Sequence, residues 1–383
     1  MIHKSPTAPR RNPLPALTSL RFFAASEVVI YHYADKALIL PFPSSIFIRL
    51  TSAGYEAVTF FFVLSGFILT YVYSGSNSVS PLNVNKSTFL LSRFARISPA
   101  YYLSLLLSIP PFIYSVYVSN IITVSVFSIS ALLVPTFLQA WCPTVAFSWN
   151  GPAWSISVEA LFYLLFHKIS QISIKLSNFV LVLSSFVFVI IGDIVRNNFL
   201  SPPTQFDSWQ HFVAYFPIFH LPQFVFGVAL GRLFLYGKSL SSKMHLGISL
   251  TGILLILVEF VPIGTENAKW TTYNGSLVIV FGLIIFGSAK MSGLAERVLC
   301  CSLLMTLGEA SYAIYILQFP IWFWWHQITR KIFNLNITSS IDFVSYFGVL
   351  CLISTISYIY FETPVRRRIM RHREYNMGSV RGR

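Results

Sequence analysis

Apolar runs of helix length recur along the chain and are separated by short polar segments. About 20 apolar residues in a helix are enough to cross the hydrocarbon core of a bilayer. Eleven such runs lie at 17–33, 56–74, 97–117, 121–140, 156–171, 178–195, 211–236, 246–262, 273–290, 304–325 and 342–361. The pattern predicts an all-α, polytopic membrane helix bundle.

The distribution of basic residues favours ten spans over eleven. The run 121–140 is the doubtful one, because it is rich in Ser and Thr and is interrupted by Pro135. If it does not cross, 20 of the 27 Lys and Arg residues face the cytoplasm and six face outward, with Arg21 inside a span. If it crosses, the counts become 10 and 16. The positive-inside rule therefore predicts about ten spans, both termini cytoplasmic, and residues 121–140 in the outer leaflet.

Composition supports a membrane protein without a soluble domain. The chain of 383 residues is 55% hydrophobic and only 10% charged, whereas soluble domains have about 25% charged residues. We divide it into a cytoplasmic tail (1–13), a membrane domain (14–365) and a basic cytoplasmic tail (366–383). The net charge of +14 includes seven arginines in that last segment. They indicate the cytoplasmic side and contact with anionic lipid, and we expect no binding of nucleic acid.

Arg21 and His32 are two polar residues within the first apolar run. Eleven residues turn a helix by about 20° more than three full turns, so both side chains share one face, roughly 16 Å apart along the axis. Such residues are costly in hydrocarbon and often mark a polar interior path. The alternative is that each side chain reaches a headgroup or caps a neighbouring helix.

Arg93 and Arg96 open the third run on its cytoplasmic side. Residues three apart share a helix face, so two guanidiniums point the same way. Paired guanidiniums suit the recognition of phosphates, although ordinary positive-inside anchoring also explains them.

Glu159 enters the apolar fifth run without a basic residue nearby in the sequence. A carboxylate in that position suits an acid–base or orienting role, or a hydrogen bond to a neighbouring helix. We expect it on the outer side, where the run begins, together with His32. Trp154 and Ser157 precede it and are candidates for the acceptor site.

The remaining polar residues carry no assigned chemistry. Ser65 and Gly66 indicate close helix packing, and Glu362 with Pro364 indicates the end of the last helix. The histidines His167, His220 and His326 are isolated in the sequence. The four cysteines have no metal-binding or redox spacing, so we expect no metal site.

Five segments, in order, resemble the acyltransferase 3 family of integral membrane O-acyltransferases. They are the first run with its Arg-x10-His pattern, Phe61-Phe-Val-Leu-Ser-Gly-Phe67, Arg93-Phe-Ala-Arg-Ile-Ser-Pro-Ala-Tyr-Tyr102, Trp154-Ser-Ile-Ser-Val-Glu159, and the closing Leu307-Gly-Glu and Phe361-Glu-Thr-Pro364. The likeness extends from about 14 to 368. Each motif is weak alone, and the five in this order are specific.

The resemblance implies transfer of an acyl group, most often acetyl, from cytoplasmic acetyl-CoA or another acyl-CoA to a hydroxyl of a glycan or lipid-linked sugar, in the cell inner (plasma) membrane. It implies His32 as general base or transient acyl carrier, with an imidazole whose ordinary pKa lies near physiological pH. Glu159 would assist it. Arg21, Arg93 and Arg96 would bind the donor, which is a co-substrate rather than a bound cofactor.

Three departures from the family pattern leave the acceptor open. Thr18 and Ser19 stand where the family commonly has Asp-Gly, Ala160 where it has a second Glu, and Gln318 where it often has His. Two alternatives also remain: an exporter of a lipid-linked sugar or polysaccharide, and the same enzyme with succinyl or another acyl donor.

Overall fold

The computed structural model describes residues 11–34, 54–80, 82–200, 214–260, 277–332 and 339–381. These residues form helices and turns and contain no strand, which confirms the all-α fold class for the described part of the chain. Lys36, Arg49 and Lys269, which contribute to the charge count, lie outside the described residues, as do residues 1–10 of the N-terminal tail.

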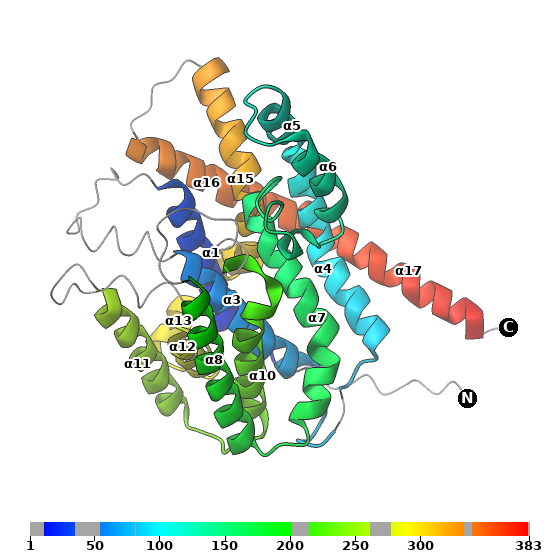
Figure 1. Ribbon diagram of the computed structural model, residues 1–383. Helices are drawn as coiled ribbons and strands as arrows, with labels where there is room; N and C mark the ends of the chain where they lie inside the picture. The colour runs from blue at the N-terminus through cyan, green and yellow to red at the C-terminus, as the bar shows by residue number, and fades with distance from the viewer. Residues whose placement is uncertain are drawn as a thin grey trace.

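The α-helices, labelled as in Figure 1, are α1 (Pro15–Tyr33), α3 (Gly54–Tyr73), α4 (Lys86–Leu107), α5 (Ile109–Tyr117), α6 (Val124–Leu133), α7 (Trp154–Ser173), α8 (Asn178–Leu200), α10 (Leu221–Tyr236), α11 (Ser242–Phe260), α12 (Val278–Ser288), α13 (Leu294–Leu299), α14 (Ser302–Glu309), α15 (Ser311–His326), α16 (Ser339–Ser357) and α17 (Thr363–Arg381). Short 3₁₀ turns are η1 (Gln139–Trp141), η2 (Gly151–Ala153) and η3 (Pro217–His220). Two π-helical segments are η5 (Gln327–Ile332) and η6 (Tyr358–Glu362).

Four described helices are long and apolar enough to cross a membrane, or five if the bent pair α4 and α5 forms one span. α6 has only ten residues, Val124–Leu133, so the described helix within the run 121–140 is too short to cross a bilayer alone. The apolar helices therefore support a membrane protein.

α1 lies inside the bundle rather than at its edge. It packs against α3, α14 and α15, while α4 packs against α7, α15 and α17 (Figure 1). Two apolar clusters form the core. One joins α1, α3, α4, α7 and α15, and the other joins α3, α10 and α12. Polar side chains on the inward faces of α1 and α4 are consequently enclosed by protein.

α3 and α10 cross closely enough that only glycine fits at the contact. A Cβ atom built at Gly66 would lie 2.2 Å from the Phe224 carbonyl oxygen, and one at Gly227 would lie 2.0 Å from the Val63 carbonyl oxygen. The close packing predicted around Gly66 is therefore present, and it fixes the helix face that carries Ser65.

α4 and α5 are bent by 43° at their junction. Pro110 and Pro111 lie in the first turn of α5 and cannot donate the hydrogen bonds that would continue α4. The chain then returns into the bundle before α7. Asn150 is buried there and donates to Ser104 Oγ and to the Ile316 carbonyl oxygen, at 3.1 and 3.0 Å. α7 therefore begins inside the bundle.

The predicted end of the last helix at Glu362 and Pro364 is wrong. The chain stays helical from α16 through η6 into α17, a continuous helical stretch of 33 residues from Ser340 to His372 in the described chain. The wider π-helical turn lies directly before Pro364, the residue that has no backbone N–H to donate. The basic C-terminal segment consequently includes a helix that projects from the bundle (Figure 1).

Candidate functional site

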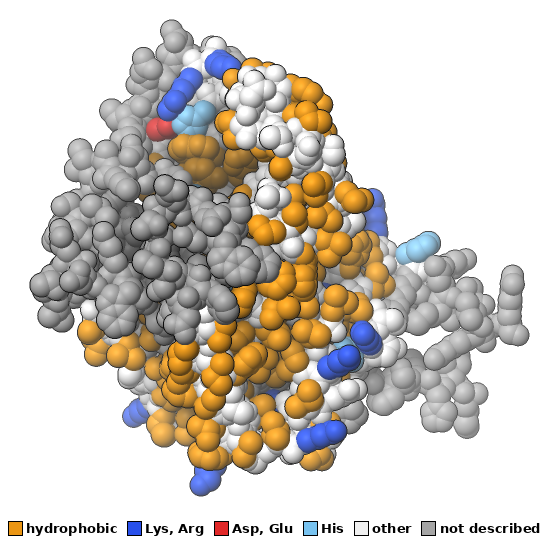
Figure 2. Space-filling view, in the orientation of Figure 1, with side chains coloured by type: hydrophobic (Ala, Val, Ile, Leu, Met, Phe, Trp, Pro, Cys, Tyr) orange, Lys and Arg blue, Asp and Glu red, His pale blue; other side chains and the backbone are white. Residues whose placement is uncertain are grey.

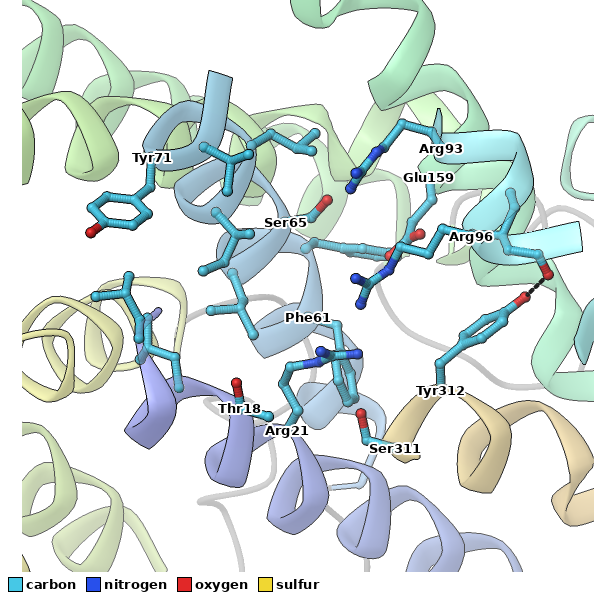
Figure 3. Close-up of a pocket in the computed structure, with 18 of the residues that line it drawn as sticks. Thr18, Arg21, Phe61, Ser65, Tyr71, Arg93, Arg96, Glu159, Ser311 and Tyr312 are labelled. Carbon is cyan, nitrogen blue, oxygen red and sulfur yellow. Dashed lines mark hydrogen bonds between the residues drawn. The ribbon is translucent and has the colours of Figure 1, made fainter. Parts of the chain in front are cut away.

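A cavity of about 540 Å³ lies between α1, α3, α4, α7 and α15. One side is polar and the other is apolar, with leucine and isoleucine side chains from α1 and α3. The polar side chains that point into it include Arg21, Arg93, Arg96, Glu159 and Ser65 (Figure 3). The cavity therefore brings together four of the predicted site residues, from three helices.

α4 presents Arg93 and Arg96 to the cavity on one face, as their spacing predicts (Figure 3). The helix begins at Lys86, because the Asn85 side chain caps it by accepting from the Thr88 backbone N–H at 2.9 Å. Arg93 donates to Tyr73 Oη at 2.7 Å, and its guanidinium carbon lies 5.3 Å from the centre of the Tyr73 ring. Its Nε is buried and has no hydrogen-bond partner. The side chain is thus fixed but has spare donors.

Arg21 enters the same cavity from α1, opposite the two arginines of α4 (Figure 3). It lies within electrostatic range of Arg96, which repels it, and of Glu159, which attracts it. Among the described residues, none of the three arginines forms an ion pair with a carboxylate within 4.0 Å. Three half-buried guanidiniums that line one cavity without paired carboxylates favour binding of an anion.

Glu159 lies with the arginines, whereas the sequence led us to expect it beside His32. It points into the cavity from α7 and accepts a hydrogen bond from Tyr163 Oη at 2.6 Å (Figure 3). The reason is the return of the chain before α7. Because the buried Asn150 fixes the segment between α4 and α15, Glu159 follows deep in the bundle, not near its surface.

Trp154 and Ser157 do not line the cavity, whereas Ser155 and Ile156 do. Helix geometry explains the difference. Ser155 and Glu159 are separated by about 40° around the axis and share a face, but Ser155 and Ser157 are about 200° apart. Trp154 packs instead against the rings of Phe62 and His220, at 6.1 and 5.3 Å.

His32 lies at the other end of α1 and does not line the cavity. It is exposed, and its ring contacts those of Tyr31 and Tyr33, at centroid distances of 5.1 and 5.9 Å. The structure thus separates the predicted residues into two groups, with Arg21, Arg93, Arg96 and Glu159 at the cavity and His32 beyond it.

Sequence reasoning missed several residues of the cavity. Ser65 was interpreted as a packing residue, yet its hydroxyl points inward beside Arg93 and Glu159 (Figure 3). Tyr315 comes from α15, and its hydroxyl lies 2.8 Å from Ser155 Oγ. Arg11 lies at one end, where it donates to the carbonyl oxygens of Ser74 and Gly75 at 3.0 and 2.9 Å. Of these residues, only Ser65 lies in a motif that the sequence analysis had singled out.

The cavity is suited to an extended ligand with a polyanionic part. Among the described residues, no group of three His, Cys, Asp or Glu side chains is placed to hold a metal ion. The chemistry of the site is therefore that of cations and hydroxyl groups: phosphates would bind the guanidiniums, and an uncharged chain would lie along the apolar side.

Known proteins similar to this chain are acyltransferases. It is 35% identical over 163 residues to acyltransferase MdmB of Streptomyces mycarofaciens, covering 41% of this chain and 39% of that protein. It is 23% identical over 387 residues to O-acetyltransferase OatA of Staphylococcus aureus, covering 93% of this chain and 57% of that protein. The chain thus spans about half the length of these relatives.

No solved structure matches the chain. The family model that matches is described as an acyltransferase domain, and it covers residues 14–361. That range includes every helix from α1 to α16 and, of the cavity's arginines, Arg21, Arg93 and Arg96. The chain belongs to the acyltransferase 3 family.

Proposed function

We propose that the protein is a membrane O-acyltransferase that moves an acetyl group from cytoplasmic acetyl-CoA to a hydroxyl of an extracytoplasmic or lipid-linked glycan. Family membership supports acyl transfer, and similarity to O-acetyltransferase OatA supports an oxygen acceptor and an acetyl group. The described residues include four or five apolar helices long enough to span a bilayer, which supports the membrane location.

The observation that carries this proposal is the group of three arginines without paired carboxylates in one cavity. Like charges repel each other more strongly inside protein than in water, so a further anion bound among the arginines stabilises the group. Coenzyme A carries several phosphates, which bind guanidiniums in a two-pronged manner. Arg21, Arg93 and Arg96 then hold the nucleotide end of the donor.

We propose that the protein lies in the inner (plasma) membrane of the cell. We propose that it crosses this membrane ten times, with both termini in the cytoplasm. This topology places Arg93 and Arg96 on the donor side and the C-terminal end of α1 on the outer side. Charge bias in the sequence supports it.

His32 acts in this proposal as the general base at the outer end of α1. It takes the proton of the acceptor hydroxyl while the oxygen attacks the thioester carbonyl carbon. The carbon–sulfur bond then breaks, the ester forms, and the proton passes to the leaving thiolate. The phosphate-bearing and acyl-bearing ends of coenzyme A are joined by a long flexible arm, which suits two sites roughly 16 Å apart along one helix.

Glu159 serves the donor end in this proposal, because it lies among the arginines. It accepts from Tyr163 and attracts Arg21, so it limits the repulsion between the guanidiniums and orients them. Its single negative charge neutralises only part of the positive charge of the three arginines, and the phosphates of the donor neutralise the rest.

Replacing Arg93 or Arg96 with alanine is expected to weaken binding of acetyl-CoA roughly ten- to a hundredfold, the loss expected when one charge-assisted hydrogen bond is removed. The dissociation constant of acetyl-CoA, measured with purified protein in detergent, tests this. Arg371→Ala is the matched control, because Arg371 is exposed on α17. Unchanged donor affinity in both cavity variants would rule out the phosphate role.

Incubation with labelled acetyl-CoA separates the enzyme from an exporter. The enzyme is expected to release coenzyme A and to transfer the label to glycan supplied in the assay. An exporter neither binds nor consumes the donor. Labelled succinyl-CoA in a parallel reaction identifies the acyl group.

A further inference from the structure

A histidine at the end of α15 and an aspartate in the first turn of α16 form an ion pair outside the cavity. His326 Nε2 lies 3.0 Å from Asp342 Oδ2, the one ion pair among the residues that the structure describes. Trp325 Nε1 donates to Asp342 Oδ1 at 2.6 Å. His326 is isolated in the sequence but has a carboxylate partner in the fold, because α16 brings Asp342 against the end of α15.

A continuous set of rings connects this pair to the end of α1. Tyr33, which follows His32, lies with its ring 4.7 Å from that of Trp322. The Trp322 ring lies 4.0 Å from the imidazole of His326. We call Tyr33, Trp322, Trp325, His326 and Asp342 the aromatic–acid cluster. It lies beside the catalytic histidine proposed above and at the opposite end of α1 from the arginines.

The backbone next to the cluster is unusual. The π-helical segment η5 begins directly after His326, at Gln327. Such turns are rare and are found frequently at functional sites, where the wider turn places side chains that a regular helix would direct elsewhere. Trp325 and His326, which both bind Asp342, occupy the last positions before it.

The cluster has hydrogen-bonding capacity left over. A carboxylate can accept about four hydrogen bonds, and Asp342 accepts from two partners. The described residues supply no partner for the indole N–H of Trp322. The side chains of His326 and Asp342 keep 15% and 13% of their surface exposed, although Asp342 as a whole residue is buried. Figure 2 shows acidic and histidine side chains side by side above a recess lined by hydrophobic side chains at this end of the molecule.

A sugar ring matches this combination of groups. It presents an apolar C–H face that packs on an indole or phenol ring, and hydroxyl groups at its edge that donate to a carboxylate and accept from an indole N–H. Tryptophan and tyrosine also occur at membrane interfaces without binding a ligand. That role would not require a carboxylate paired with histidine among the rings.

We propose that the aromatic–acid cluster binds a sugar ring of the acyl acceptor and holds its hydroxyl near His32. This inference rests on the function proposed above, and it assigns the acceptor to a site separate from the donor cavity. Asp342 and Trp322 would contact the sugar, while His326 and Trp325 would hold Asp342 in place.

The test uses surface glycan purified from cells that lack the gene, which is the acceptor without its acyl group. Binding of this glycan to purified full-length protein is measured by tryptophan fluorescence, and binding of acetyl-CoA is measured in parallel. Asp342→Asn and Trp322→Phe are each expected to weaken glycan binding roughly tenfold or more, with donor affinity unchanged. Trp322→Phe keeps an aromatic ring at this position and removes the indole N–H.

Trp324→Phe is the matched control, because the Trp324 indole donates to the Leu107 carbonyl oxygen outside the cluster. It is expected to bind glycan like the wild type. If Asp342→Asn does not fold, as shown by its thermal unfolding, Trp322→Phe decides the question alone. Equal glycan binding by the wild type and Trp322→Phe overturns the cluster as a sugar site. The same holds if Trp322→Phe lowers only the stability of the protein in lipid vesicles, which is the effect expected of a residue that merely anchors the protein at the membrane interface. A wild type that binds no glycan contradicts the proposed acceptor itself.

Discussion

Replacing His32 with alanine is expected to abolish acylation of the glycan, with a loss of at least a hundredfold in turnover, typical for removal of a general base. The protein should still insert and should still bind acetyl-CoA, because His32 does not line the cavity that holds the arginines. Turnover is measured with labelled acetyl-CoA and purified glycan, and donor affinity is measured on the same preparation.

His372→Ala is the matched control for this variant, because His372 is exposed on α17 and far along the chain from α1. It should acylate glycan at the wild-type rate. Normal product from His32→Ala would contradict the assignment of the base. Loss of donor binding in that variant would show that the two ends of α1 do not act separately. Label that stays on the wild-type protein but not on His32→Ala would instead identify His32 as an acyl carrier.

Replacing Gly66 with alanine is expected to prevent the protein from accumulating in its folded form. The added methyl group would lie 2.2 Å from a backbone oxygen of α10, which no side-chain movement relieves. Excess volume in a well-packed core typically costs about 1–3 kcal/mol, and a clash with backbone belongs at the upper end or beyond it. The yield of monodisperse protein after detergent extraction and its thermal unfolding measure the effect.

Gly247→Ala provides the matched control on α11, because a Cβ atom there meets nothing within 4 Å. Alanine favours a helix over glycine by about 1 kcal/mol, so this variant should be as stable as the wild type or more stable. Wild-type stability of Gly66→Ala would show that α3 and α10 do not cross at this contact.

The sequence predicted those parts of the site that depend on spacing within one helix. Arg93 and Arg96 share a face because three residues nearly complete a turn, and both line the cavity. The helical character of the described chain also followed from the apolar runs. These features depend on local geometry, which one sequence contains in full.

Three features of the fold and the site were not predicted from the sequence. Glu159 joined the arginines because Asn150, buried between α4 and α15, draws the start of α7 into the bundle. His326 met Asp342 because α16 folds back along α15. The helix also continued past Pro364, since a π-helical turn accommodated the proline. The first two depend on contacts between distant segments, which no spacing rule contains, and the third depends on a local π-helical turn.

The central claim is that the protein transfers an acyl group to a surface glycan with a donor held by the arginines and a base at His32. Mass spectrometry of surface glycan from cells with the gene, without it, and with the Arg93→Ala or His32→Ala variant in its place tests this most directly. The proposed function predicts glycan heavier by one acetyl group in cells with the wild-type gene, less of that product with Arg93→Ala, and none with His32→Ala or without the gene. Glycan of identical mass in all four strains would contradict it.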